Sequence, residues 1–171
     1  MKRLLILALV TATPAAMAAT EVTMHRVSAD GVGDAIGTVT FSNSEYGMLI
    51  EPDLKGLEPG VHGFHVHRKP SCQPAVKDGD MTAAAAAGGH FDPDDTGRHR
   101  GPYSASGHLG DLPALTVDSM GNAAMPLLAP RLEVGALAGH AVMVHGNGDN
   151  YADQPNKLGG GGPRVACGVI E

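Results

Sequence analysis

The feature that most constrains the fold is the regular interruption of short apolar segments by turn residues. The chain contains 24 glycines and 12 prolines, and no long stretch repeats its apolar residues with the period of a helix. Turn signals recur at Asp30-Gly31, Pro59-Gly60, residues 120–122 and residues 159–162. Such punctuation favours many short strands. The sequence therefore predicts an all-β chain that folds as a sandwich or a barrel.

Eight segments between these turns have the length and composition of strands. We expect strands at residues 21–27, 35–41, 48–52, 60–67, 114–117, 123–128, 140–145 and 165–170. Residues 68–113 show no convincing strand pair, and an irregular segment of this length inside a compact domain is usually functional or disordered. Because this segment carries His90, His99 and His108, we expect a loop that folds around metal.

The first residues follow the order of a secretory signal peptide. Lys2 and Arg3 precede the apolar run 4–10, and residues 16–18 fit the small-x-small cleavage pattern. The apolar run is shorter than the roughly 20 residues that a membrane-spanning helix needs. We therefore expect residues 1–19 to be a cleaved signal peptide and residues 20–171 to form a single exported domain.

Charge and cysteine content restrict the partners and the covalent structure. Removal of Lys2 and Arg3 takes the formal net charge from −6 to −8, which argues against nucleic acid and anionic membranes as partners. An anionic substrate would therefore need a local positive patch. The only two cysteines, Cys72 and Cys167, most simply form one disulfide in an exported chain.

Six of the nine histidines have spacings that suit metal binding. His65 and His67 point to the same face of a strand, about 7 Å apart, although such a pair alone is a weak signal. Three more histidines and one carboxylate in the following loop form a suitable closed zinc set, and a further imidazole ends a strand. These residues are His90, His99, His108, Asp111 and His145.

Nitrogen ligands without thiolates suit copper(II). The remaining histidines lack a partner at a useful spacing. We interpret His62 and His140 as hydrogen-bonded structural residues and His25 as a surface residue.

Several motifs together resemble the copper/zinc superoxide dismutases, most closely their bacterial periplasmic branch. They lie in the order and spacing of that family at residues 63–67, 88–93, 96–99, 107–113, 144–145, 148–150 and 159–170. The resemblance implies an eight-stranded Greek-key sandwich or flattened barrel with long metal-binding loops. It also implies a periplasmic location.

The resemblance implies a role for each matching position, with one copper ion and one zinc ion per chain. The implied copper ligands are His65, His67, His90 and His145, and the implied zinc ligands are His90, His99, His108 and Asp111. His90 would then be a bridging imidazolate. Cys72 and Cys167 match the family disulfide, Arg164 matches the arginine beside copper, and Asp149 matches a carboxylate that links His65 to His99.

The activity that the resemblance implies is the conversion of superoxide into dioxygen and hydrogen peroxide by Cu(II)/Cu(I) cycling. His90 would hold a proton, and Arg164 would orient the anion. Pro163 departs from the family pattern, which leaves the aim of Arg164 open. The cation that attracts superoxide also stays open among Lys157, Lys77 and Arg68.

Two other functions compete with dismutation. A non-catalytic copper-binding or copper-delivery module of the same fold would be expected to lose copper ligands or the arginine, and this chain keeps all of them. A zinc hydrolase needs an open zinc position, which the predicted zinc set does not leave. The sequence does not choose between a monomer and a homodimer.

Overall fold

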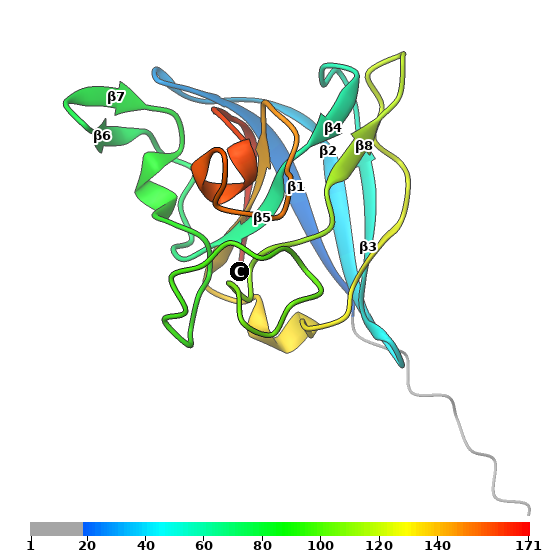
Figure 1. Ribbon diagram of the computed structural model, residues 1–171. Coiled ribbons are helices and arrows are strands. Elements are labelled where there is room, and N and C mark those ends of the chain that lie inside the picture. Colours follow the sequence, from blue (N-terminus) through cyan, green and yellow to red (C-terminus); the bar gives the residue numbers. More distant parts are fainter. Residues whose placement is uncertain (1–18) are drawn as a thin grey trace, which may run out of the picture.

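The computed structural model describes residues 19–171 (Figure 1), so the predicted signal peptide lies outside the described residues except for Ala19. This part of the chain contains strands and three short 3₁₀ turns and no α-helix. The strands are β1 (Ala19–Ser28), β2 (Gly31–Ser44), β3 (Gly47–Leu54), β4 (Gly60–His62), β5 (Phe64–His67), β6 (Ala75–Lys77), β7 (Asp80–Thr82), β8 (Leu115–Val117), β9 (Leu127–Ala129), β10 (His140–His145) and β11 (Arg164–Ile170). The 3₁₀ turns are η1 (Ala85–Ala87), η2 (Val134–Ala136) and η3 (Lys157–Gly160).

Seven strands form one antiparallel sheet in the order β5-β10-β11-β1-β2-β3-β9, and β4 pairs with β8 beside it. Figure 1 shows the seven-stranded sheet curling into a half-barrel. An isolated bridge between Leu54 and Ala123 joins the end of β3 to the segment that follows β8. The predicted all-β, barrel-like class is therefore confirmed.

Alternating burial along the strands builds the core inside this curl. In β3, Met48, Ile50 and Leu54 are buried while Glu51 and Asp53 face outward, as expected for a strand with one face in the core. Strand β10 differs because all its residues from Ala141 to His145 are buried. Its outer face is covered by loops, and this covering creates room for a buried site outside the barrel.

The β6–β7 hairpin contradicts the prediction that residues 68–113 hold no strand pair. Val76 pairs with Met81 and Lys77 with Asp80, and Figure 1 shows this hairpin projecting from the body. Its two-residue turn is Asp78-Gly79, and both residues have positive φ, 55° and 95°. Asp-Gly is a strong sequence signal for this turn type, so the hairpin was detectable from local sequence.

Two other predicted strands are shorter than expected. The segment predicted at 123–128 forms a strand only from Leu127, because Pro126 lacks the N–H that a ladder requires. The segment predicted at 60–67 divides at Gly63, whose N–H donates to Asn147 O and whose carbonyl accepts the His145 N–H, at 2.8 Å each. This break lets the loop after β10 approach β5.

The predicted disulfide between Cys72 and Cys167 is confirmed, with 95 residues of separation along the chain. It ties the loop after β5 to β11, and both cysteines lie in a small second cluster with Ala84, Ala87, Ala141 and Met143. This cluster fixes the loop on the outer face of β10. Across residues 19–171, we find no helix with the length and apolar character needed to cross a membrane.

Candidate metal centre

Three of the candidate histidines lie on the loop-covered face of two neighbouring strands. In β5, Phe64 and Val66 enter the barrel core, so His65 and His67 point the other way. The register pairs His65 with Met143 and His67 with Ala141 of β10. His145 ends β10 on that same face, because it follows Met143 by two residues.

Backbone pairing places the loop residues His90 and Asp111 against β5. His90 forms an isolated bridge with His67, and Asp111 forms one with His65. Between them, Val66 N–H donates to Gly110 O at 2.8 Å. A Cβ atom at Gly110 would lie 2.4 Å from Val66 O, so this close approach requires glycine.

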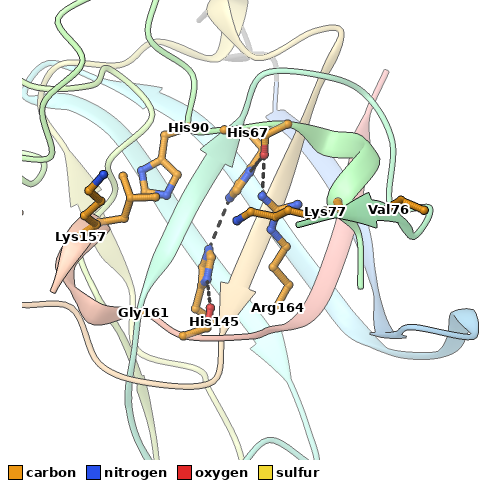
Figure 2. A pocket seen from close by; sticks show the side chains of 13 residues that line it. His67, Val76, Lys77, His90, His145, Lys157, Gly161 and Arg164 are labelled. Atoms are coloured by element: carbon orange, nitrogen blue, oxygen red, sulfur yellow. Dashed lines mark hydrogen bonds between the residues drawn. The ribbon is translucent and has the colours of Figure 1, made fainter. Parts of the chain in front are cut away.

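The first group of convergent ligand atoms belongs to His65, His67, His90 and His145, whose ligand atoms lie within 4.8 Å of one another. All four side chains are buried. His67 Nδ1 donates to Gly88 O at 2.9 Å, and His145 Nδ1 donates to Gly162 O at 3.2 Å. These bonds leave the Nε2 lone pairs of His67 and His145 facing each other at 3.4 Å (Figure 2).

His65 and His90 each add an unpaired nitrogen to this group. His65 Nε2 donates to Asp149 Oδ2 at 2.7 Å, and His90 Nδ1 donates to Asp111 Oδ1 at 2.9 Å. Their other atoms, His65 Nδ1 and His90 Nε2, are buried without a hydrogen-bond partner among the described residues. Buried polar atoms normally have partners, and four converging nitrogen lone pairs fit a metal ion.

The second group surrounds the Asp111 carboxylate. The Nδ1 atoms of His90, His99 and His108 lie 2.9, 3.0 and 3.2 Å from its oxygens. The four ligand atoms there that lie within 4.8 Å of one another belong to His90, His99, Asp111 and His65, which stands in place of the expected His108. His65 is close because its ring stacks on His90 with a centroid distance of 4.0 Å, while its Nε2 is already bonded to Asp149.

Asp149 joins the two groups through its two carboxylate oxygens. Oδ2 accepts the His65 Nε2–H and Oδ1 accepts the His99 Nε2–H, both at 2.7 Å, and the side chain is fully buried. A Cβ atom at Gly159 would lie 1.8 Å from Asp149 Oδ1. Only glycine therefore lets this part of the loop close over the carboxylate.

The pKa values match a centre that binds cations. Burial lowers the pKa of His65 and His67 well below the usual value and lowers that of His145 to about 4. Burial opposes ionisation of Asp111 and Asp149, but hydrogen bonds from histidines hold the pKa of each carboxyl far below its usual range. At neutral pH these imidazoles are neutral and the carboxylates ionised, as metal ligands must be.

His99 behaves differently because it lies between two carboxylates. Burial alone would lower its pKa, but the close contacts with Asp111 and Asp149 raise the pKa to about 9. Its Nδ1 faces Asp111 Oδ2 without hydrogen-bond geometry. The space between these two atoms therefore favours a positive charge, either a proton or a metal ion.

A cavity of about 430 Å³ opens onto the first group, and His67, His90 and His145 lie in its wall. Arg164, at the start of β11, also lines it. Its guanidinium donates to Ala84 O at 2.6 Å and to Gly88 O at 2.5 Å, the second of which Figure 2 shows. The structure thus aims Arg164 into the cavity despite Pro163. Of the three candidate cations, Lys77 and Lys157 line the cavity, and Arg68 is absent from its described lining.

The three histidines without metal-like spacing lie outside both groups. His62 is buried, and its ring nitrogens lie 2.7 Å from His145 O and 2.8 Å from Glu58 O. His140 Nδ1 lies 2.9 Å from Arg68 O, and its ring contacts the Phe91 ring in a tilted arrangement with a centroid distance of 4.1 Å. His25 is part-exposed, with its Nδ1 3.1 Å from Gly33 O.

Two supporting residues escaped the sequence interpretation. Asp153 Oδ2 accepts the backbone N–H of His99 at 2.9 Å. The Arg131 guanidinium donates to the carbonyls of Gly107 and His108 at 3.0 and 3.1 Å. Both contacts hold the loop that carries His99 and His108. The Asp153 contact joins residues 54 positions apart, and the Arg131 contacts join residues 23 and 24 positions apart. A local sequence pattern cannot detect contacts over such separations.

Comparisons with known proteins agree with this geometry. The family model described as copper/zinc superoxide dismutase (SODC) matches residues 35–170. A copper-zinc superoxide dismutase of Escherichia coli K12 is 55% identical over 174 residues, which cover 100% of both chains. A second such enzyme, from Salmonella typhimurium LT2, is 54% identical over 175 residues and also covers both chains fully.

Solved structures show the same fold. The copper/zinc superoxide dismutase from Brucella abortus superposes with a TM-score of 0.88 at 45% identity, covering 90% of this chain and 100% of that chain. The solution structure of the monomeric copper, zinc superoxide dismutase from Salmonella enterica gives a TM-score of 0.81 at 54% identity with the same coverage.

Proposed function

This chain belongs to the copper/zinc superoxide dismutase family, and we infer that it converts superoxide into dioxygen and hydrogen peroxide with one copper and one zinc ion. One observation carries the inference to this chain's own residues. Four buried imidazole nitrogens converge, two of them without a hydrogen-bond partner among the described residues, and three of the four rings line a cavity that Arg164 also lines. That arrangement suits a bound metal within reach of a small anion.

We propose that copper is held by His65 Nδ1, His67 Nε2, His90 Nε2 and His145 Nε2. In the rings of His65, His67 and His145 the opposite nitrogen donates a hydrogen bond to a carbonyl or carboxylate, whereas in His90 the opposite nitrogen faces Asp111. Such bonds select the tautomer and fix the ring orientation. An all-nitrogen set suits copper(II).

For zinc we propose His90, His99 and His108 through Nδ1, together with Asp111. His65 is not part of this set, because its Nε2 is engaged with Asp149 and its Nδ1 is needed for copper. Three imidazoles and one carboxylate complete a tetrahedral zinc shell. His90 then belongs to both sets, one ring nitrogen for each ion.

When bound, copper supplies reversible one-electron exchange because both its oxidation states are accessible, and zinc supplies a fixed positive charge. The protein supplies the rest. Arg164 holds the incoming anion beside His67 and His145, since its guanidinium is permanently charged and offers several donors. Nε2 of His90 would hold one of the two protons that peroxide requires whenever it does not hold copper.

Lys77 and Lys157 provide the local positive patch that this acidic chain needs. Both line the cavity, on the β6–β7 hairpin and at the start of η3. Opposite charges at an opening raise the rate of encounter, and salt weakens the effect. We therefore assign them the attraction of superoxide and assign Arg164 its final orientation.

The non-catalytic alternative is less favourable. A copper-delivery module would need the histidines but would have no use for an arginine held in the cavity by two carbonyls. Arg164 therefore favours dismutase activity. We also propose that the chain is exported to the periplasm, as its N-terminal residue pattern and its disulfide indicate.

The decisive experiment measures metal content and dismutase activity of the purified protein after loading with copper and zinc. His145→Ala should lose copper and activity together, and His25→Ala, outside both groups, should keep both. Full activity of wild-type protein with zinc but without copper would refute the proposed function. An unchanged copper content in His145→Ala would refute the copper set.

A further inference from the structure

Tyr151 occupies an unusual backbone position between the two loops that cover the metal centre. Its φ is +57°, a region that bulky residues rarely adopt. It lies two residues after Asp149, in the loop that follows β10. Strained conformations of this kind persist only where the surroundings hold them, so contacts with neighbouring residues must keep Tyr151 in this conformation.

The backbone of Tyr151 contacts the carboxylate that joins the two ligand groups. Its N–H donates to Asp149 Oδ1 at 2.8 Å, the same oxygen that accepts the His99 Nε2–H. The unusual φ therefore belongs to a residue that helps to orient Asp149.

The side chain of Tyr151 contacts the other loop. Its hydroxyl oxygen accepts the Ala114 N–H at 2.9 Å, three residues beyond Asp111. Its ring lies so close to Gly101 that a Cβ atom there would be 2.6 Å from Tyr151 Cγ. Gly101 in turn donates its N–H to Asp111 Oδ2 at 3.2 Å.

We propose that Tyr151 is a positioning residue for the zinc set. It braces Asp149 through its backbone, and through its ring and hydroxyl it braces the segment that presents Asp111. Without this side chain, Gly101 loses the ring against which it packs and the Ala114 N–H loses its acceptor, so the Asp111 carboxylate loses its fixed orientation. This inference rests on the proposed zinc ligands and adds a residue that touches neither ion.

The test uses zinc affinity and the visible spectrum of Co(II) bound in place of zinc. Tyr151→Ala should raise the zinc dissociation constant about 10- to 100-fold, the usual effect of removing support behind a ligand. It should also change the Co(II) spectrum, which reports ligand geometry. Tyr103→Ala is the matched control, because Tyr103 is 68% exposed and should leave both measurements unchanged.

The possible outcomes distinguish a failure of the proposed zinc ligands from a failure of the proposed role of Tyr151. A wild-type chain that binds no zinc would refute the zinc set itself. A wild-type chain that binds zinc, with Tyr151→Ala within twofold of it and spectrally identical, would refute only the role of Tyr151, even if the variant unfolds more easily. If Tyr151→Ala does not fold, Tyr151→Leu decides. It removes the aromatic ring and the hydroxyl but keeps an apolar side chain, and a zinc dissociation constant less than twofold above wild type with an unchanged Co(II) spectrum would overturn the proposal.

Discussion

Removing the Cys72–Cys167 disulfide should destabilise the protein by a calculable amount. The link closes a loop of 95 residues, and the chain-entropy relation gives about 4.7 kcal/mol for a loop of that length at 25 °C. Measured losses are often smaller, so we expect about 3 to 5 kcal/mol for the Cys72→Ala/Cys167→Ala variant. Domains of this size are stable by about 5 to 15 kcal/mol, so the loss is a large fraction of the total.

Urea denaturation of the metal-free protein measures this loss. The chain contains no tryptophan, so unfolding is best followed by far-ultraviolet circular dichroism. The single variant Cys72→Ala should lose nearly as much free energy of unfolding as the double variant, because the cross-link and not the side chains carries the effect. A loss below about 1 kcal/mol in the double variant, or a much smaller loss in the single variant, would contradict the entropic reasoning.

Three further predictions concern the cavity and its histidines. Arg164→Ala should lower the dismutation rate about 10-fold or more, the value of a charge-assisted contact, while copper content stays at the wild-type level; an unchanged rate removes Arg164 from the mechanism. Lys157→Glu should lower the rate most at low ionic strength, whereas Lys55→Glu, outside the cavity lining, should not. Burial lowers the pKa of His145 from its usual 6.5 to about 4 in the folded protein. The unfolded chain therefore binds a proton first, and the metal-free protein should lose stability as the pH falls from about 6.5 to about 4. Relative to His145→Gln, urea titrations should show an extra loss of about 2 to 3 kcal/mol between pH 6.5 and 4.5, and equal losses would contradict the assignment.

Local sequence predicted the strands well where one face enters the core. Turn residues bound the predicted segment 48–52, and its apolar residues mark β3 within two residues at each end. The predicted strand 140–145 coincides with β10. The predictions were less accurate at Pro126 and Gly63, where a missing donor and a crossing loop interrupt the ladder.

The metal centre shows where local patterns stop being informative. Strand periodicity puts His65 and His67 on one face, but nothing in that periodicity brings His145 to them from 78 positions beyond His67. The pairing of β5 with β10 does so. The resemblance to a known family named the ligands, whereas Tyr151 and Asp153 matter through contacts with segments about 37 to 54 residues distant. Such contacts leave no spacing that a sequence pattern can detect.

The sharing of Asp149 and His90 between the two groups has a thermodynamic consequence. An ion in either group fixes an imidazole or a carboxylate that the other group also uses, so the two binding equilibria cannot be independent. By linkage, the factor by which zinc changes the affinity for copper equals the factor by which copper changes the affinity for zinc. The occupancy of each metal group therefore depends on the supply of the other metal as well as on that of its own.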